Sequence, residues 1–152
     1  MSETKRPVRI ANCSGFFGDR LAAAKEQVEG GAIDVLTGDW LAELTMLILA
    51  RQRLKGGEGS GWATTFGKQM EQVLGTCLER GIKVVSNAGG LDPKGCADAI
   101  RAKADEAGLG HVKIAYITGD DLMPNLSELR ADGEPLLNLD TGEDLAAIGF
   151  DP

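Results

Sequence analysis

Four short runs of apolar and β-branched residues recur along the first part of the chain. Runs of this kind are typical of strands in a parallel sheet, because helices cover both faces of such a sheet. We therefore predict four parallel strands, "VRIANC" (8–13), "IDVLT" (33–37), "IKVVS" (82–86) and "VKIAYI" (112–117).

Between these runs, apolar residues return at helical spacing. The second helical segment is so rich in apolar residues that we expect it to be largely buried. Two boundaries are well marked: Gly81 follows the third segment, and Asp92 with Pro93 opens the fourth as N-cap and first helical residue. The pattern predicts helices over 19–29, 40–54, 65–80 and 93–107.

Alternating strands and helices indicate an α/β fold. The connection between the second and third strands contains two helices, which is long enough to cross from one side of the first strand to the other. With right-handed crossovers, the simplest arrangement is a three-layer open parallel sheet in the order 2-1-3-4, with helices on both faces. We expect one domain over residues 1–152.

The pattern weakens after Tyr116. The remaining residues predict one helical turn and a weak hairpin around 140–142. No further strand–helix unit follows, so we expect an incomplete domain whose unfinished sheet edge favours self-association. The glycine-rich segment 55–67 is either a flexible connector or a mobile lid over a site.

Composition narrows the possible partners. A hydrophobic share of 43% and a charged share of 26% are those of a soluble globular protein. The net charge of −7 argues against nucleic acid and against an anionic membrane as partners. No signal peptide and no bilayer-spanning run is visible. Three widely spaced cysteines suit reduced thiols in a cytoplasmic protein.

Two loops are the candidates for a ligand site. Ligands of open parallel sheets bind at the carboxyl ends of the strands, where the strand order reverses. In the order 2-1-3-4 that crevice lies between strands one and three, beside "CSGFFGDR" (13–20) and "SNAGGLDP" (86–93). Glycines there allow close approach, and the following helix starts present N–H groups. The expected ligand-binding residues are Ser14, Gly15, Gly18, Ser86, Asn87, Gly89, Gly90 and Asp92.

The sequence of the first of these loops is a degenerate match to the dinucleotide-binding fingerprint. Residues 13–18 match G-x-G-x-x-G with cysteine in the first position, and Asp39 follows at the end of the second strand. That is where dinucleotide-binding folds place the acid that binds the ribose. The match leaves three alternatives open, namely nicotinamide dinucleotide binding, another anion contact, or a plain tight turn.

The candidate catalytic residues are Asn87, Asp39 and Asp120. Asn87 can either form a turn or present its amide to a ligand. Asp39 and Asp120 each follow a Thr-Gly pair, where an aspartate can cap a turn or act in acid–base or metal chemistry. The predicted order puts their strands at opposite edges of the sheet, so we expect no metal site. The single histidine, His111, is expected to be structural or solvated.

The same segments carry a resemblance to a known family. "RIANCSGFFGDR", "DVLTGDWLAELTM", "VVSNAGGLDPKGCA" and "AYITGDDL" make the chain resemble, over residues 8–140, the N-terminal part of the acyclic terpene utilisation AtuA family. The resemblance implies a cytoplasmic bacterial protein in the breakdown of citronellol- and geraniol-type terpenoids through acyl-CoA thioesters. It names no catalytic residue and no cofactor. Typical members are several times longer, so the chain is expected to be the N-terminal part of such a protein.

Three functional hypotheses follow. In the first, the protein is an enzyme that binds an acyl-CoA or small carboxylate, and Asn87 with the Gly89 and Gly90 amides polarises a carbonyl. In the second, the same crevice binds a nucleotide-like ligand without chemistry. In the third, the domain is a docking half for a partner subunit.

Overall fold

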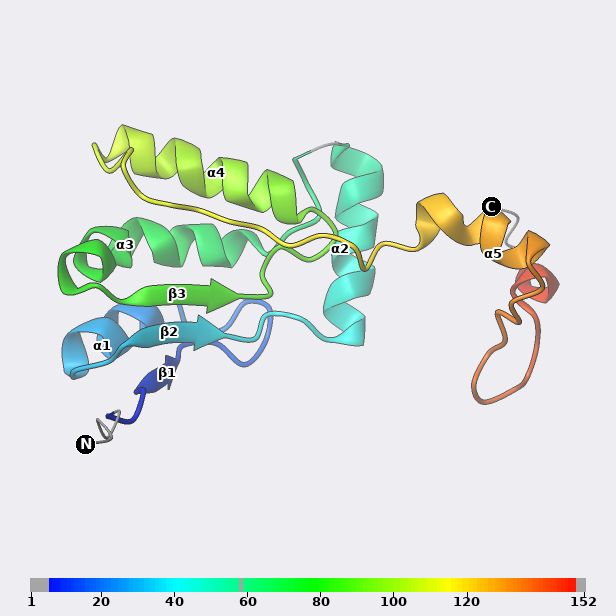
Figure 1. Ribbon diagram of the computed structural model, residues 1–152, viewed down its shortest axis with the longest axis horizontal. Coiled ribbons are helices and arrows are strands. Elements are labelled where there is room, and N and C mark those ends of the chain that lie inside the picture. Colours follow the sequence, from blue (N-terminus) through cyan, green and yellow to red (C-terminus); the bar gives the residue numbers. More distant parts are fainter. Residues whose placement is uncertain (1–5, 58, 150–152) are drawn as a thin grey trace, which may run out of the picture. The chain divides into compact units, whose positions relative to one another are not determined.

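A computed structural model describes residues 6–57 and 59–149 of the chain. The chain divides into two compact units, Met1–Ile117 and Thr118–Pro152, which are described separately. The first unit contains, in chain order, β1 (Ile10–Asn12), α1 (Ala23–Gly30), β2 (Val35–Gly38), α2 (Glu43–Gly56), α3 (Thr64–Arg80), β3 (Lys83–Ser86) and α4 (Pro93–Glu106) (Figure 1).

The sheet of the first unit has three parallel strands in the order β1-β2-β3. The predicted order 2-1-3-4 is wrong, because β2 is the central strand and separates β1 from β3 (Figure 1). The connection between β2 and β3 is long enough to cross over β1, but it leads to the position next to β2. Its extra helix, α2, instead lies crosswise beyond the carboxyl ends of β2 and β3.

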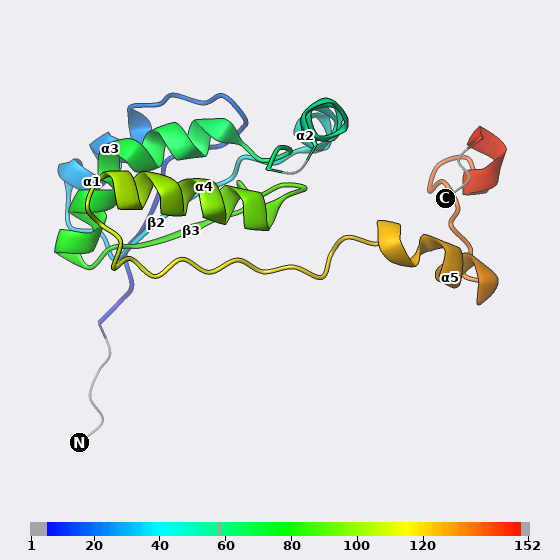
Figure 2. The ribbon, with the colours of Figure 1, turned by 90° about the horizontal axis from the view of Figure 1, so that it is seen from above.

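The expected fourth strand is not formed. Residues 112–117 are extended and run past α4, yet they make no strand pairing (Figures 1 and 2). Arg101 of α4 holds the start of this segment by donating to the backbone oxygens of Gly110, at 3.1 Å, and Val112, at 2.6 Å. Val112 and Ile114 are half-buried while Lys113 is exposed, so the side chains alternate as in a strand although no ladder is present.

In the described part of the first unit, helices cover one face of the sheet. α1, α3 and α4 lie together on that face (Figure 2), and Ala11 and Leu36 point into it. On the other face Ile10 is 65% exposed and Val85 is 60% exposed. The expectation of helices on both faces is therefore wrong for the described residues. Two successive crossovers of the same hand, both moving to the next strand in line, leave their helices on the same side.

One hydrophobic core connects the sheet with these helices. Its fully buried members include Val28 of α1, Leu36 of β2, and Val73 and Cys77 of α3. The helix ends follow the sequence signals. Gly81 closes α3 in the left-handed region, with φ +67°.

The expectation that the second helix is buried is wrong. Only Thr45 and Leu49 of α2 are buried, and three of its leucines are exposed. Apolar residues lie all around this helix, so the sequence pattern defined no face for packing. α2 contacts the rest of its unit along one narrow side.

The second unit is built from short elements. A 3-10 turn, η1 (Met123–Asn125), leads into α5 (Leu126–Ala131), and a second turn, η2 (Leu145–Ile148), follows later. The predicted hairpin is confirmed, because Asn138 N donates to Glu143 O at 2.8 Å and a single bridge joins Leu137 to Asp144.

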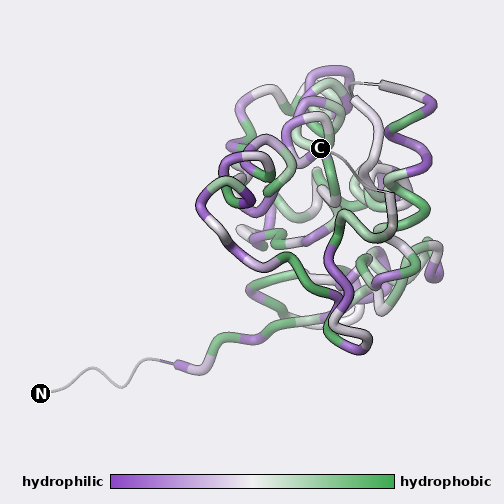
Figure 3. The backbone as a smooth tube through the Cα atoms, turned by 90° about the vertical axis from the view of Figure 1, so that its right-hand side faces the viewer, coloured by the Kyte–Doolittle hydropathy of each residue, from purple (hydrophilic) through white to green (hydrophobic). Residues whose placement is uncertain are grey.

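The backbone coloured by hydropathy shows hydrophobic and hydrophilic residues interleaved along the chain (Figure 3). Among the described residues, no helix is both long and apolar enough to cross a membrane.

Asp34 ties the segment before β1 to the start of β2. Arg6 binds both of its carboxylate oxygens, at 2.8 and 2.7 Å, and Arg9 N donates to it at 2.9 Å. The hydrogen bonds from Arg6 and Arg9 hold the pKa of this carboxyl far below its usual range.

The lowered pKa of Asp34 determines the direction in which the stability of the fold changes with pH. A carboxyl whose pKa is lower in the folded state stabilises the fold above its unfolded pKa of about 4 and loses that contribution as the pH falls. We expect the urea midpoint to drop between about pH 6 and about pH 3, and Asp34→Asn to show a shallower drop. Equal slopes for both proteins in urea titrations would contradict this account of Asp34.

Candidate functional site

The loops that follow the three strands meet at the carboxyl end of the sheet. We call residues 13–20, 38–41 and 86–92 the rim. Three hydrogen bonds join the loops: Asp39 N donates to Ser14 O at 2.9 Å, Trp40 N donates to Asn87 Oδ1 at 2.9 Å, and Asn87 Nδ2 donates to Asp39 Oδ1 at 2.7 Å. The order β1-β2-β3 means that these are contacts between neighbouring loops. The predicted crevice between the first and third strands is therefore wrong, since β2 and its loop lie between them.

Asn87 joins two loops of the rim through its side chain. Its Oδ1 accepts from Trp40 N, and its Nδ2 donates to Asp39 Oδ1 at 2.7 Å. The side chain thus both donates and accepts, as a side-chain amide can. Two bonds fix its orientation, and one of the two Nδ2 hydrogens remains. Asn87 as a whole residue is exposed.

Asp39 is the partner that Asn87 orients. Its Oδ1 accepts from Asn87 Nδ2 and, at 3.1 Å, from Leu41 N. These bonds, the one from Asn87 first, hold the pKa of Asp39 below its usual value. Asp39 is therefore ionised at neutral pH and presents a carboxylate beside the amide.

The first loop binds its own carboxylate. Asp19 Oδ2 accepts from Gly15 N at 2.9 Å, and Asp19 Oδ1 accepts from Arg20 N at 2.7 Å. The bond from Gly15 is the main cause of a lowered Asp19 pKa. Ser14 is buried and its hydroxyl donates to Phe16 O at 3.1 Å, while Gly18 takes a positive φ of +86°. A donor of the expected anion site is thus already bound to Asp19.

The second glycine loop is packed beneath the end of the glycine-rich segment. Leu91 N donates to Gly61 O at 2.9 Å, and Ala63 N donates to Ala88 O at 2.8 Å. Gly90 has φ +52°, and a Cβ there would lie 2.5 Å from Leu49 Cδ1 and 2.7 Å from Gly61 O. Glycine at position 90 is therefore explained by packing and backbone conformation.

The other residues of this loop also have structural partners. Ser86 Oγ accepts from Ala88 N at 2.8 Å. A Cβ at Gly89 would lie 2.9 Å from Pro93 Cα, so the loop fits closely against the first turn of α4.

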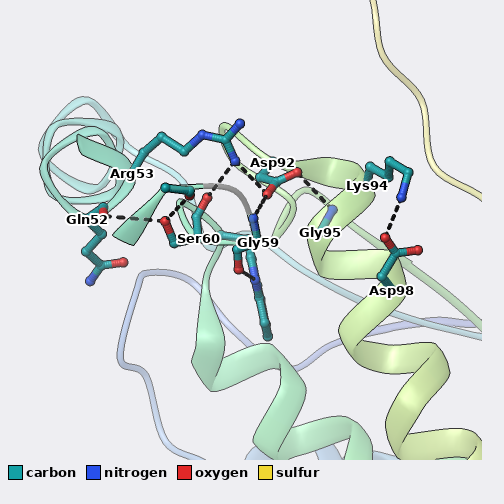
Figure 4. A network of polar contacts seen from close by, with 10 residues as sticks. Gln52, Arg53, Gly59, Ser60, Asp92, Lys94, Gly95 and Asp98 are labelled. Carbon is teal, nitrogen blue, oxygen red and sulfur yellow. Dashed lines mark hydrogen bonds and ion pairs between the residues drawn. The ribbon is translucent and has the colours of Figure 1, made fainter. Parts of the chain in front are cut away.

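Asp92 joins this loop to α2 and to the glycine-rich segment (Figure 4). Its Oδ1 accepts from Gly95 N at 2.8 Å, which confirms the predicted N-cap of α4. Its Oδ2 accepts from Arg53 Nη1 at 2.7 Å and from Gly59 N at 2.9 Å. Arg53 also donates to Ser60 O at 3.3 Å. Hydrogen bonds therefore hold the segment at both Gly59 and Ser60. That segment 55–67 is a mobile lid over a site stays a prediction.

Sequence reasoning missed Trp40 and Arg53. Trp40 is only 1% exposed, and its ring packs edge-on against Phe66 at a centroid distance of 5.1 Å. A Cβ at Gly38 would lie 2.5 Å from this ring, so the Thr-Gly-Asp-Trp order has a packing reason. A glycine two residues before a tryptophan was the available signal for Trp40. The available signal for Arg53 was a cation placed just before the glycine-rich segment.

Each loop of the rim thus contains an aspartate whose carboxylate accepts a hydrogen bond from a nearby backbone N–H group. Asp19, Asp39 and Asp92 accept the N–H groups that a phosphate would otherwise bind. Three carboxylates also repel a polyanion, which argues against a pyrophosphate in this position. The geometry instead leaves an oriented neutral amide beside a carboxylate, an arrangement that can bind a carbonyl oxygen. Ligand binding by the expected residues stays a prediction.

The remaining candidate groups are Asp120 and the three cysteines. Asp120 belongs to the second unit, where it is exposed and outside any helix or strand. Burial raises the pKa of Cys13 and Cys77 to about 11 and that of Cys96 to about 12, so these free thiols are protonated at neutral pH. Over residues 6–57 and 59–149, no cluster of three or more histidine, cysteine or acidic side chains is arranged to hold a metal ion.

Comparison with known proteins gives one match. A family model described as "Acyclic terpene utilisation family protein AtuA" matches residues 8–152. No curated protein and no solved structure matches the chain.

Proposed function

Because this chain belongs to the acyclic terpene utilisation AtuA family, we propose that it acts in the bacterial breakdown of acyclic terpenoids of the citronellol and geraniol type, or of related acyl-CoA compounds. Three free cysteines suit a reducing compartment, so the proposal places this role in the cytoplasm.

The ligand site of this proposal is the Asn87–Asp39 pair. The observation that carries it is the orientation of the Asn87 amide by two bonds, 2.7 Å to Asp39 and 2.9 Å from Trp40 N. An oriented donor loses little freedom when a ligand binds, which is the basis of preorganised recognition. The second Nδ2 hydrogen of Asn87 would bind the carbonyl oxygen of an acyl group.

The charge of the rim supports an acyl group in preference to a nucleotide. Asp19 and Asp39 both have lowered pKa values, so both carboxylates carry a charge at neutral pH. Phosphates close to them would be repelled, whereas a thioester or amide carbonyl is neutral. In an acyl-CoA, the acyl end would therefore occupy the rim, and the nucleotide end would extend away from it.

An amide-shift titration tests this site. We expect short acyl-CoAs to shift the amides of residues 38–41 and 86–91, and free coenzyme A or ATP to shift them much less. Asn87→Ala should weaken acyl-CoA binding about tenfold or more, since about 1.4 kcal/mol of hydrogen bonding corresponds to a factor of ten.

Asn138→Ala is the matched control. Asn138 is an exposed asparagine of the second unit, and its Oδ1 accepts from two backbone N–H groups. Shifts confined to other regions, or equal affinity for Asn87→Ala and wild type, would overturn the site. Growth of a deletion strain on citronellol tests the family role separately. Normal growth there would argue against the role in terpenoid breakdown, whatever the titration shows.

A further inference from the structure

α2 carries a stripe of exposed leucines. Leu44 is 68% exposed, Leu47 is 48% exposed and Leu54 is 87% exposed. Their spacing puts them on one side of a helix with 3.6 residues per turn. The opposite side holds the buried Thr45 and Leu49 and thereby faces the rest of the unit. The stripe thus points away from the domain that α2 belongs to.

In the described part of the first unit, loops contact α2 along its buried side, but no other helix or strand packs along it. Within the described residues of the first unit, the contacts between elements join α1, α3, α4 and the three strands, but not α2. α2 is held at its ends and along one side, by Leu49 below Gly90 and by the ion pair between Arg53 and Asp92. Three large apolar side chains on one helix face without a partner are typical of an interaction surface.

We propose that this surface binds a second copy of the same chain, with the two α2 helices antiparallel. The charges of the helix favour that occupant. Glu43 lies in the first turn, whereas Lys55 lies in the last turn, and both are exposed. An antiparallel pair places the acidic end of each helix beside the basic end of the other. A parallel pair would place like charges together.

The leucine positions fit the same symmetry. In an antiparallel pair centred near the middle of α2, Leu44 of one copy lies opposite Leu54 of the other. Leu47 lies opposite Arg51, whose aliphatic stem can cover it while the charged end reaches water. Such an interface is isologous, the commonest kind in homodimers. It is also small, because a helix of 14 residues is only about 21 Å long, so the association should depend strongly on concentration.

Sedimentation equilibrium over a range of concentrations tests the proposal. The full chain should shift from monomer to dimer as concentration rises, and Leu47→Lys should raise the dissociation constant at least about tenfold. The matched control is Leu137→Lys, because Leu137 is 50% exposed and lies in the second unit. Circular dichroism should show unchanged helix content and melting for both variants. A wild-type chain that stays monomeric, or two variants that associate alike, would overturn the proposal.

A charge exchange tests the antiparallel arrangement. Glu43→Lys and Lys55→Glu should each weaken self-association, because each juxtaposes like charges across the two-fold axis. An equimolar mixture of the two variants should associate more strongly than either variant alone, since opposite charges then meet at both ends. No gain on mixing would rule out the antiparallel pair. Binding of wild type to lipid vesicles without any dimer in solution would show that a membrane occupies the stripe, which would also overturn the proposal.

Discussion

Gly90→Ala is expected to lower the free energy of unfolding by about 3 kcal/mol. This loss is the sum of the cost of a left-handed backbone at alanine and the cost of steric overlap of the new Cβ with its neighbours. Gly90 has φ +52°, and the new Cβ would lie 2.5 Å from Leu49 Cδ1 and 2.7 Å from the backbone oxygen of Gly61. Leu49 can move, but the Gly61 oxygen is fixed because it accepts from Leu91 N. The glycine-rich segment would have to separate from the rim.

Gly81→Ala is the matched control. Gly81 has φ +67° at the end of α3, and nothing lies within 4 Å of a Cβ built there. The same substitution at position 81 should therefore cost only the backbone strain, about 1 kcal/mol. Urea unfolding of both variants measures the difference. Equal losses at the two positions would show that Gly61 and Leu49 yield easily, and that backbone conformation alone requires glycine at position 90.

Trp40→Ala is expected to destabilise the fold by about 3–5 kcal/mol, the usual cost of removing a buried aromatic ring. The ring is 1% exposed and packs against Phe66 at a centroid distance of 5.1 Å. The backbone N–H of the same residue donates to Asn87 Oδ1, so the position of Trp40 affects the rim. Removal of the ring should therefore loosen the rim as well as the core.

A double-mutant cycle checks the fit between this ring and Gly38. Gly38→Ala in the wild type places a Cβ 2.5 Å from the Trp40 ring, so we expect a loss of about 2 kcal/mol. In the Trp40→Ala background both ring contacts at 2.5 Å are gone and Ser14 Cβ lies at 3.1 Å, so the same change should cost much less. Additive losses in thermal or urea unfolding would mean that Gly38 is required for a reason other than the tryptophan.

Much of the local structure could be predicted from the sequence. Asp92 and Pro93 begin α4 as the N-cap rule requires, and Gly81 ends α3 with a left-handed residue. β1 and β3 fall inside the predicted apolar runs, and β2 extends one residue beyond its run, to Gly38. These features depend on residues only a few positions apart, so a single stretch of chain contains all the information that determines them. The rim loops follow from the same reasoning, since parallel strands bring their carboxyl ends together.

The strand order and the exposure of α2 were decided by the tertiary structure. A long connection allows several crossovers, and its length alone cannot distinguish a crossing over β1 from a helix placed beyond the strand ends. α2 has apolar residues on all sides, so only its anchors at Leu49 and Arg53 show which side faces the domain. A strand predicted over 112–117 is apolar enough to pair, yet pairing also needs a register with β3, which no local pattern contains.

The chemistry of the rim was likewise decided in three dimensions. The sequence identified Asn87 and Asp39 as separate candidates, and the structure joins them although they are 48 positions apart. It also uses the loop donors for Asp19 and Asp92, so the anion sites expected from glycines and helix starts are filled by the chain itself. Local sequence therefore determined where the polar groups lie along the chain. Only long-range packing determined which of them bind one another and which remain for a ligand, because a hydrogen bond depends on distance in space and not on separation in sequence.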